Sequence, residues 1–458
     1  VDYWLKAGER ATTQGATLEA RHFFDRALDT IEPGDVERRW RALWGRETAL
    51  CFRGERLAQK ADIEALLALA EQLDDDGRRS QAHLRHARYV SSQADYRELA
   101  QVADAAIAAA QRAGRPALAV EALAYKVTAL LRLGERSALR SVVAETLALA
   151  QTIGEDDIRS YAMAAVALYY FENGDLAHAA QILTQSLHAA RRSQNRHLDL
   201  ECQYHGHLGF AFAQLGLYSE ARDALEAGLE LANLTGIGRH QAYQMVNLGF
   251  VHWRSGDLAT AIQMEEAALQ EYAATGDAFG QAVCRAYLGY MHEEMGDLVP
   301  AAGDLAAARL GFAELGVEPD KIEAQATEAR VLLALGQPEA ARQLTMDVWE
   351  YLCEQGTDGF SSPAWVYVCV ADVLAQVGNP GISAVAVLAA GCREVLLRAD
   401  RISDAAWRRA FLHNVAENRA VMAAPVTQAR RMNSASDTAR RMNSASDTAR
   451  RMNSASDT

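Results

Sequence analysis

Proline is scarce in this sequence, and so are the clustered β-branched residues that strands require. Only eight prolines occur among 458 residues, and valine and isoleucine seldom follow one another. Alanine, leucine and glutamate dominate instead, which is typical of helices. One hydrophobic core stops growing near ~250 to 300 residues, so a chain of this length divides into domains or repeats. We therefore expect an all-α chain, and its composition favours a repeat solenoid.

Cysteine is also sparse, and long apolar runs are missing. The six cysteines include no C-x-x-C pair and no dense framework, which is typical of reduced, packed thiols in a cytosolic protein. No apolar run approaches the ~18 residues of a membrane span, and the start "VDYWLKAGER" lacks the regions of a signal peptide. We expect a cytoplasmic chain without membrane contact. The first residue is not methionine, which suggests a piece of a longer protein.

Positive charge is in short supply outside the last thirty residues. The formal net charge is −14, and the final thirty residues hold six arginines and three aspartates, so the remainder carries about −17. Such an acidic body repels the phosphates of nucleic acids. We therefore expect no nucleic-acid binding by the body, and a basic protein or peptide partner is compatible with its charge.

Catalytic and phosphate-binding motifs are missing as well. The sequence contains no G-x-x-x-x-G-K-[ST], no G-x-G-x-x-G after a strand, no G-x-S-x-G and no H-E-x-x-H. An enzyme is therefore the least favoured class, and no cofactor is predicted. The best metal candidate is "ECQYHGHLG", in which Cys202 and His205 share one helical face and His207 does not. Two ligands make no metal site, so we interpret these residues as a buried thiol beside interhelical histidines.

Glycine recurs with a period of about forty residues. The series occupies positions Gly134, Gly174, Gly216, Gly256, Gly296, Gly336 and Gly378. Walking back by forties reaches Ala94, Gly54 and Gly15. A second set lies about twenty residues from the first, at Gly34, Gly77, Gly114, Gly154, Gly236, Gly276, Gly316 and Gly356. Glycine favours the left-handed turn that ends a helix, so the spacing predicts about ten units of two helices each.

Small residues keep the same register as the turn glycines. The stretches "LGFVHWRSGDLATA" and "LGYMHEEMGDLVPA" show the pattern, with a small residue seven before and five after each turn glycine. The clearest members are Gly209, Gly249 and Gly289 before the turns, Gly216, Gly256 and Gly296 in them, and Ala221, Ala261 and Ala301 after them. Their size lets two paired helices approach closely, whereas a leucine would overpack the crossing by ~1 to 3 kcal/mol. We also expect Asp257 to cap its helix.

These small positions resemble those of the tetratricopeptide repeat. The usual period of that family is ~34 residues. A period of forty is similar to the lengthened repeats in the sensor domains of STAND-class signalling ATPases, ATP-dependent LuxR-type regulators and related cyclases. The resemblance implies a right-handed superhelical solenoid of about ten antiparallel helix pairs. It also implies that any nucleotide hydrolysis lies outside this sequence.

The periodicity divides the chain into three parts. We expect the solenoid over residues 1–402 and one capping helix over 403–424, in which Trp407, Phe411 and Val415 close the last repeat and Glu417 faces solvent. The segment 425–458 is a polar tail with three identical copies of "ARRMNSASDT", interpreted as a recent duplication, a tag or a tethered peptide. Its charge would let it occupy an acidic groove. Candidate phosphorylation sites follow paired arginines at Ser434, Ser444 and Ser454.

An aromatic row is the candidate binding surface. Phe210, Phe250 and Tyr290 follow the helix glycines at intervals of forty, and Trp253 lies one turn beyond Phe250. The resemblance implies that this position faces the concave groove, where aromatic rings would hold a peptide or partner helix. The alternative is that the rings pack between repeats. His252 and His292 recur beside the row and complete the set of candidates, and their spacing argues against a shared proton or metal.

The sequence therefore predicts a non-enzymatic protein or peptide interaction scaffold, acting as the sensor domain of a larger cytosolic signalling protein. The alternative is a small-molecule sensor that controls a linked ATPase, cyclase or transcription regulator. A peptide scaffold should show exposed aromatics in a groove. A small-molecule sensor should show an enclosed pocket with a few converging polar groups.

Overall fold

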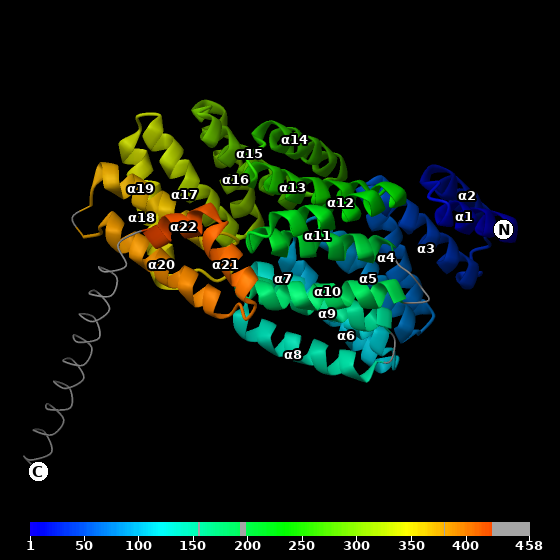
Figure 1. Cartoon of the computed structure of the whole chain (residues 1–458). Coiled ribbons are helices and arrows are strands. Elements are labelled where there is room, and N and C mark those ends of the chain that lie inside the picture. Colours follow the sequence, from blue (N-terminus) through cyan, green and yellow to red (C-terminus); the bar gives the residue numbers. More distant parts are fainter. Residues whose placement is uncertain (154–155, 193–197, 380, 424–458) are drawn as a thin grey trace, which may run out of the picture.

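The computed structural model describes residues 1–153, 156–192, 198–379 and 381–423 (Figure 1). Within these residues the chain forms 22 α-helices and no strand. The first ten helices are α1 (Asp2–Thr13), α2 (Thr17–Thr30), α3 (Val36–Arg53), α4 (Arg56–Gln72), α5 (Asp76–Ser92), α6 (Tyr96–Arg112), α7 (Pro116–Leu133), α8 (Arg136–Thr152), α9 (Asp156–Glu172) and α10 (Leu176–Arg192). The others are α11 (Leu198–Gln214), α12 (Tyr218–Thr235), α13 (Gly238–Arg254), α14 (Leu258–Thr275), α15 (Ala278–Met295), α16 (Leu298–Leu315), α17 (Glu318–Ala334), α18 (Pro338–Gln355), α19 (Pro363–Val377), α20 (Ala384–Asp400), α21 (Ala405–His413) and α22 (Ala416–Ala423).

Helices α1 to α20 form ten consecutive hairpins. Each odd-numbered helix packs against the even-numbered helix that follows it, and each hairpin packs against the next one along the chain. The predicted all-α solenoid of about ten antiparallel pairs is confirmed. In the described part of the chain, no helix combines the length and the apolar character that a membrane crossing needs.

Left-handed residues end most of the helices. Gly216, Gly256 and Gly296 have φ values of +74°, +89° and +83°, a backbone region that side chains other than glycine rarely adopt. The Asp257 side chain then accepts a hydrogen bond from Thr260 N (3.3 Å), as its predicted capping role requires. Ala94 occupies the position that the forty-residue period of the glycines predicts for a turn, and its φ is +56°.

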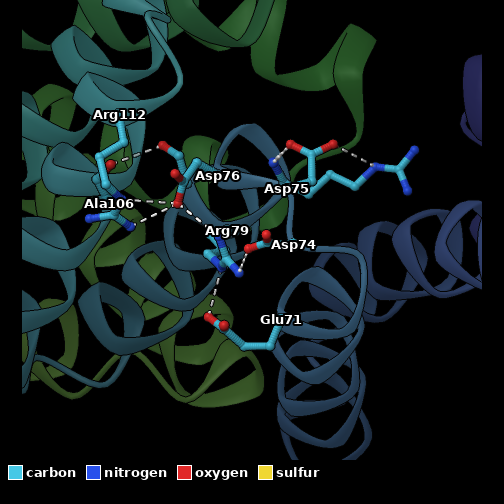
Figure 2. Close-up of polar contacts among 9 residues, drawn as sticks. Glu71, Asp74, Asp75, Asp76, Arg79, Ala106 and Arg112 are labelled. Atoms are coloured by element: carbon cyan, nitrogen blue, oxygen red, sulfur yellow. Dashed lines mark hydrogen bonds and ion pairs between the residues drawn. The ribbon is translucent and has the colours of Figure 1, made fainter.

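The break predicted at Gly77 is wrong, because Gly77 lies inside α5 and the left-handed residue is Asp74, with φ +48°. Acidic side chains at this turn gather around arginines. Arg79 donates to Glu71, Asp74 and Asp76 at 2.7 to 3.0 Å, as Figure 2 shows. These ion pairs offset part of the negative charge of the cluster within the protein. The other predicted break at Gly154 lies outside the described residues.

The small residues lie where paired helices approach one another. Ala221, Ala261 and Ala301 are fully buried. A Cβ atom added at Gly289 would lie 2.5 Å from Leu305 Cγ, and one added at Gly209 would lie 2.4 Å from Leu225 Cγ. Both distances are too short for any side chain. We call this contact between the two helices of a hairpin the seam.

Segments far apart in the sequence touch as the solenoid winds. The Arg56 guanidinium donates to Thr275 O (3.0 Å), although the two residues are 219 positions apart. Arg132 of α7 lies 3.8 Å from Asp320 of α17 and stacks over the Phe279 ring of α15 at 4.4 Å. Early and late hairpins therefore form one packed body.

The C-terminal segment differs from the single capping helix that we predicted. It forms two short helices, α21 and α22, and α21 lies between α11 and α20 in Figure 1. Phe411 and Val415 are buried, and Trp407 packs edge-on against Phe212 of α11 (5.7 Å between ring centroids). The prediction that Glu417 faces solvent is wrong, because this side chain is 5% exposed and pairs with Arg254 of α13. The tail, with Ser434, Ser444 and Ser454, lies outside the described residues.

Candidate functional site: an aromatic pocket under the C-terminal helices

Five aromatic rings from three odd-numbered helices form one cluster. Phe250 and Trp253 lie on α13, Tyr287 and Tyr290 on α15, and Trp365 on α19. Trp253 is the centre, with ring centroids 5.7 Å from Phe250, 6.0 Å from Tyr290 and 6.1 Å from Trp365. Mixed edge-on and tilted contacts at such distances are favourable for aromatic pairs.

Helical spacing explains why these rings meet. Phe250 and Trp253 are three positions apart on α13, and so are Tyr287 and Tyr290 on α15, so each pair shares one helix face. Because α13 and α15 contact each other in adjacent hairpins, the two faces become continuous. Trp365 adds a third group to the cluster from α19, which lies two hairpins after α15.

The indole nitrogens of the cluster are both hydrogen-bonded. Trp253 Nε1–H donates to Glu294 Oε2 (2.6 Å), and Trp365 Nε1–H donates to Thr327 Oγ1 (2.8 Å). These bonds fix the orientation of the two largest rings. The cluster is thus a rigid aromatic wall.

A carboxyl group and a loop lie beside this wall. Glu323 of α17 accepts a hydrogen bond from the backbone N–H of Ser362 (2.8 Å). Burial raises the pKa of Glu323 to about 8, despite the opposing effect of that hydrogen bond. Ser362 belongs to the loop between α18 and α19, residues 356–362. Arg398 donates a hydrogen bond to Thr357 O (3.1 Å) at the start of the same loop.

A buried ion pair closes the pocket. Arg254, at the end of α13, pairs with Glu417 of α22, and the two side chains are only 8% and 5% exposed. Arg254 also stacks over the Trp253 ring, 5.1 Å from its centroid. We define the inner pocket by the residues that line it: Phe250, Trp253, Arg254, Tyr287, Tyr290, Glu323, Ser361, Ser362, Trp365 and Glu417.

The structure brings three of the six predicted binding residues into the inner pocket. Phe250, Trp253 and Tyr290 line it, but they are 5%, 5% and 7% exposed, so the rings both pack between repeats and form a pocket. Phe210 lies elsewhere and stacks on Phe171, with centroids 4.8 Å apart. The side chains of His252 and His292 contact residues of their own hairpins.

Each of those histidines has a local acidic partner. His252 Nδ1 lies 3.2 Å from Asp257, and His292 Nδ1 lies 3.1 Å from Asp304. Although the two histidines occupy equivalent repeat positions, their partners are not equivalent. Neither histidine lines the inner pocket.

The residues of "ECQYHGHLG" are not gathered around a common point. Cys202 Sγ–H donates to Gly228 O (3.3 Å), His205 contacts Arg191 (2.8 Å), and His207 Nδ1 contacts the Tyr243 hydroxyl (2.8 Å). No group of three or more metal-ligating side chains occurs among the described residues.

Seven of the ten residues that line the inner pocket were not predicted as binding residues from the sequence: Arg254, Tyr287, Glu323, Ser361, Ser362, Trp365 and Glu417. One signal was available in "GTDGFSSP", residues 356–363, because this loop is longer than the other turns and breaks the periodicity beside Trp365. Glu417 carried no such signal. Its partner lies 163 positions away on a helix of a different hairpin.

The hairpin architecture defines the class: the protein is a tetratricopeptide-like helical-repeat solenoid, as the small-residue register suggested. No protein-family model matches this chain, and no curated protein sequence matches it. Among solved structures, it is similar to a Rap protein complexed with competence and sporulation factor, with TM-score 0.51 and 9% identity over 75% of this chain and 97% of that one.

Two further similar structures have related architectures. NprR in complex with its cognate peptide NprX has TM-score 0.50 and 13% identity, over 73% of this chain and 98% of that one. PH0952 from Pyrococcus horikoshii, a STAND protein with a tetratricopeptide repeat sensor, has TM-score 0.41 and 13% identity, over 76% and 54% of the two chains. At these identities the likeness to the Rap and NprR structures establishes the fold alone.

Proposed function

We propose that this chain is a peptide-binding regulatory scaffold, and that the inner pocket is where a peptide binds. The observation that carries the proposal is the position of α22. This short helix packs on α19 and α20 and places Glu417 beside Arg254 in the lining of the inner pocket, so the pocket already accommodates a side chain from a helical segment of polypeptide. A groove that takes an amphipathic helix is one of the recurring modes of peptide recognition.

The composition of the pocket supports this role. Tryptophan, tyrosine and arginine supply most of the binding energy at protein interfaces, especially in well-packed and desolvated positions. The inner pocket combines Trp253, Trp365, Tyr287, Tyr290 and Arg254. The Rap and NprR structures of similar fold contain a bound factor and a bound peptide, which supports a peptide ligand here. We assign this chain to the sensing part of a larger signalling protein.

A matched pair of substitutions tests the proposal. Phe250 and Phe210 occupy the same register position, but only Phe250 lines the inner pocket. Peptides selected from a displayed random library against the whole chain should bind Phe250→Leu at least about tenfold more weakly, a loss of about 1.4 kcal/mol. Phe210→Leu should bind them as the parent does. Equal effects of the two substitutions would place peptide binding away from the pocket.

The burial of the rings favours a second candidate, a small-molecule sensor. Glu323, Ser361 and Ser362 converge beside the rings, and the rings are buried rather than exposed in an open groove. A metabolite library should then contain a compound that raises the melting temperature of the parent chain and of Phe210→Leu but not of Phe250→Leu. Peptide selection that yields no binder while such a compound appears would favour this candidate.

A further inference from the structure

The contact between the C-terminal helices, α21 and α22, and the solenoid has features of a contact that another peptide could replace. Helices α21 and α22 have nine and eight residues, and helices of this length are marginal without tertiary packing. They pack on α19 and α20, where Phe411 and Val421 join the main hydrophobic core, and they reach α11 and α13 through a few specific groups. Asn414 Nδ2–H donates to Gly216 O (2.9 Å), Trp407 packs on Phe212, and Glu417 pairs with Arg254.

The packing under these helices is incomplete. A second hollow adjoins the inner pocket and shares Ser361, Ser362 and Glu417 with it. Gln214 of α11 lines this hollow, is 7% exposed, and its Nε2 atom has no hydrogen-bond partner. A buried amide without a partner costs about 1 to 3 kcal/mol. The interface therefore leaves a polar group that another occupant could satisfy.

Arg254 is held in place independently of α22. Its guanidinium lies over the Trp253 ring, and it interacts electrostatically with the Tyr218 side chain of α12. Removing Glu417 would leave a positioned and largely buried cation without a carboxylate partner, which is strongly unfavourable. The solenoid therefore presents a ready-made site for one carboxylate, set against an aromatic wall.

We propose that Arg254 is a carboxylate-recognition site occupied by Glu417 in the resting chain, and that a helical peptide bearing a carboxylate side chain binds by displacing α21 and α22. This inference rests on the proposed function, because it names the chemistry of the peptide and the segment that regulates its access. The ligand presents an aspartate or glutamate side chain to Arg254 and apolar side chains to the rings. This charge differs from the basic partner that the net charge of the body suggested.

A synthetic peptide of residues 403–424, capped at both ends and fluorescently labelled, serves as the probe. The targets are the full chain and its Glu417→Gln variant, in which the internal competitor keeps its shape but loses its charge. Fluorescence anisotropy should show about tenfold tighter binding to Glu417→Gln than to the parent. The same peptide with glutamine at the position of Glu417 should bind that variant about tenfold more weakly than the glutamate form.

A double variant guards against misreading a folding defect. Methionine at both Arg254 and Glu417 replaces the ion pair by apolar groups, an exchange that buried pairs often tolerate. Circular dichroism should show that this chain is folded, and it should bind the two peptides equally.

Two results would overturn the inference. Equal affinity of both peptides for folded Glu417→Gln would show that Arg254 does not read the carboxylate, while peptide docking itself would stand. No binding of either peptide to that folded variant would show that α21 and α22 are a permanent cap. The library selection would then decide the proposed function separately.

Discussion

The seam and the inner pocket lie on the same helices but follow different rules. Along the seam, equivalent residues recur: Gly209 lies against Leu225, and two hairpins later Gly289 lies against Leu305. In the inner pocket only some of the lining residues have such equivalents. Phe250 has an equivalent in Tyr290, but the position forty after Trp253 is Glu293, which pairs with Arg330 instead of joining the ring cluster. Residues that recur in every hairpin serve the packing of the hairpin itself. Residues without an equivalent in the neighbouring hairpins serve one local site, here the inner pocket.

One seam residue breaks the rule and provides the largest expected effect. Glu265 stands where the neighbouring hairpins have Leu225 and Leu305, is fully buried, and both of its carboxyl oxygens lack a hydrogen-bond partner. Burial raises the pKa of Glu265 well above its ordinary value. Glu265→Leu should raise the free energy of unfolding by about 3 kcal/mol, from relieved desolvation and added apolar burial. Denaturant melts at pH 7 measure it.

The pH dependence of the same variant sharpens that prediction. A raised pKa in the folded state contributes stability at low pH that is lost as pH rises. The advantage of Glu265→Leu over the parent should therefore grow from pH 5 to pH 8. A destabilised variant would instead mean that this carboxyl has a role in the native seam.

A glycine pair tests the rule of close approach. Gly289→Ala should lower the free energy of unfolding by about 2 kcal/mol, because the new Cβ would lie 2.5 Å from Leu305 Cγ. Gly303→Ala is the control, since nothing lies within 4 Å of a Cβ there. It should raise stability by about 0.5 to 1 kcal/mol through helix propensity. Chemical unfolding that gives both variants the same sign would refute the seam as described.

Glu323 gives a smaller effect, because its side chain is less completely buried than that of Glu265. Its folded pKa of about 8 exceeds the ordinary 4.5, so its contribution to stability is fully present below pH 4.5 and is lost as pH rises through 8. Glu323→Gln should lose less stability than the parent between pH 5 and pH 8.5. Thermal melts that run parallel for the two chains would contradict this environment for Glu323.

Local periodicity explains which parts of the fold could be predicted from the sequence. The turn glycines, the small seam residues and the hairpins follow from contacts between residues close in sequence, and Phe250, Trp253 and Tyr290 entered the candidate site through the same register. The position of Trp365 and the pairing of Arg254 with Glu417 depend on how hairpins far apart in the chain meet. The amphipathic pattern of residues 403–424 places Glu417 on the polar side of a helix, and it could not show that Arg254 is the buried partner of this side chain.

We place peptide binding in the inner pocket and not along the seam. The most direct measurement is hydrogen exchange of the whole chain with and without a peptide selected from the library. We expect slower amide exchange in α13, α15 and α19, faster exchange in α21 and α22, and no change in α14 and α16. Protection confined to the even-numbered helices, with α21 and α22 unchanged, would contradict it.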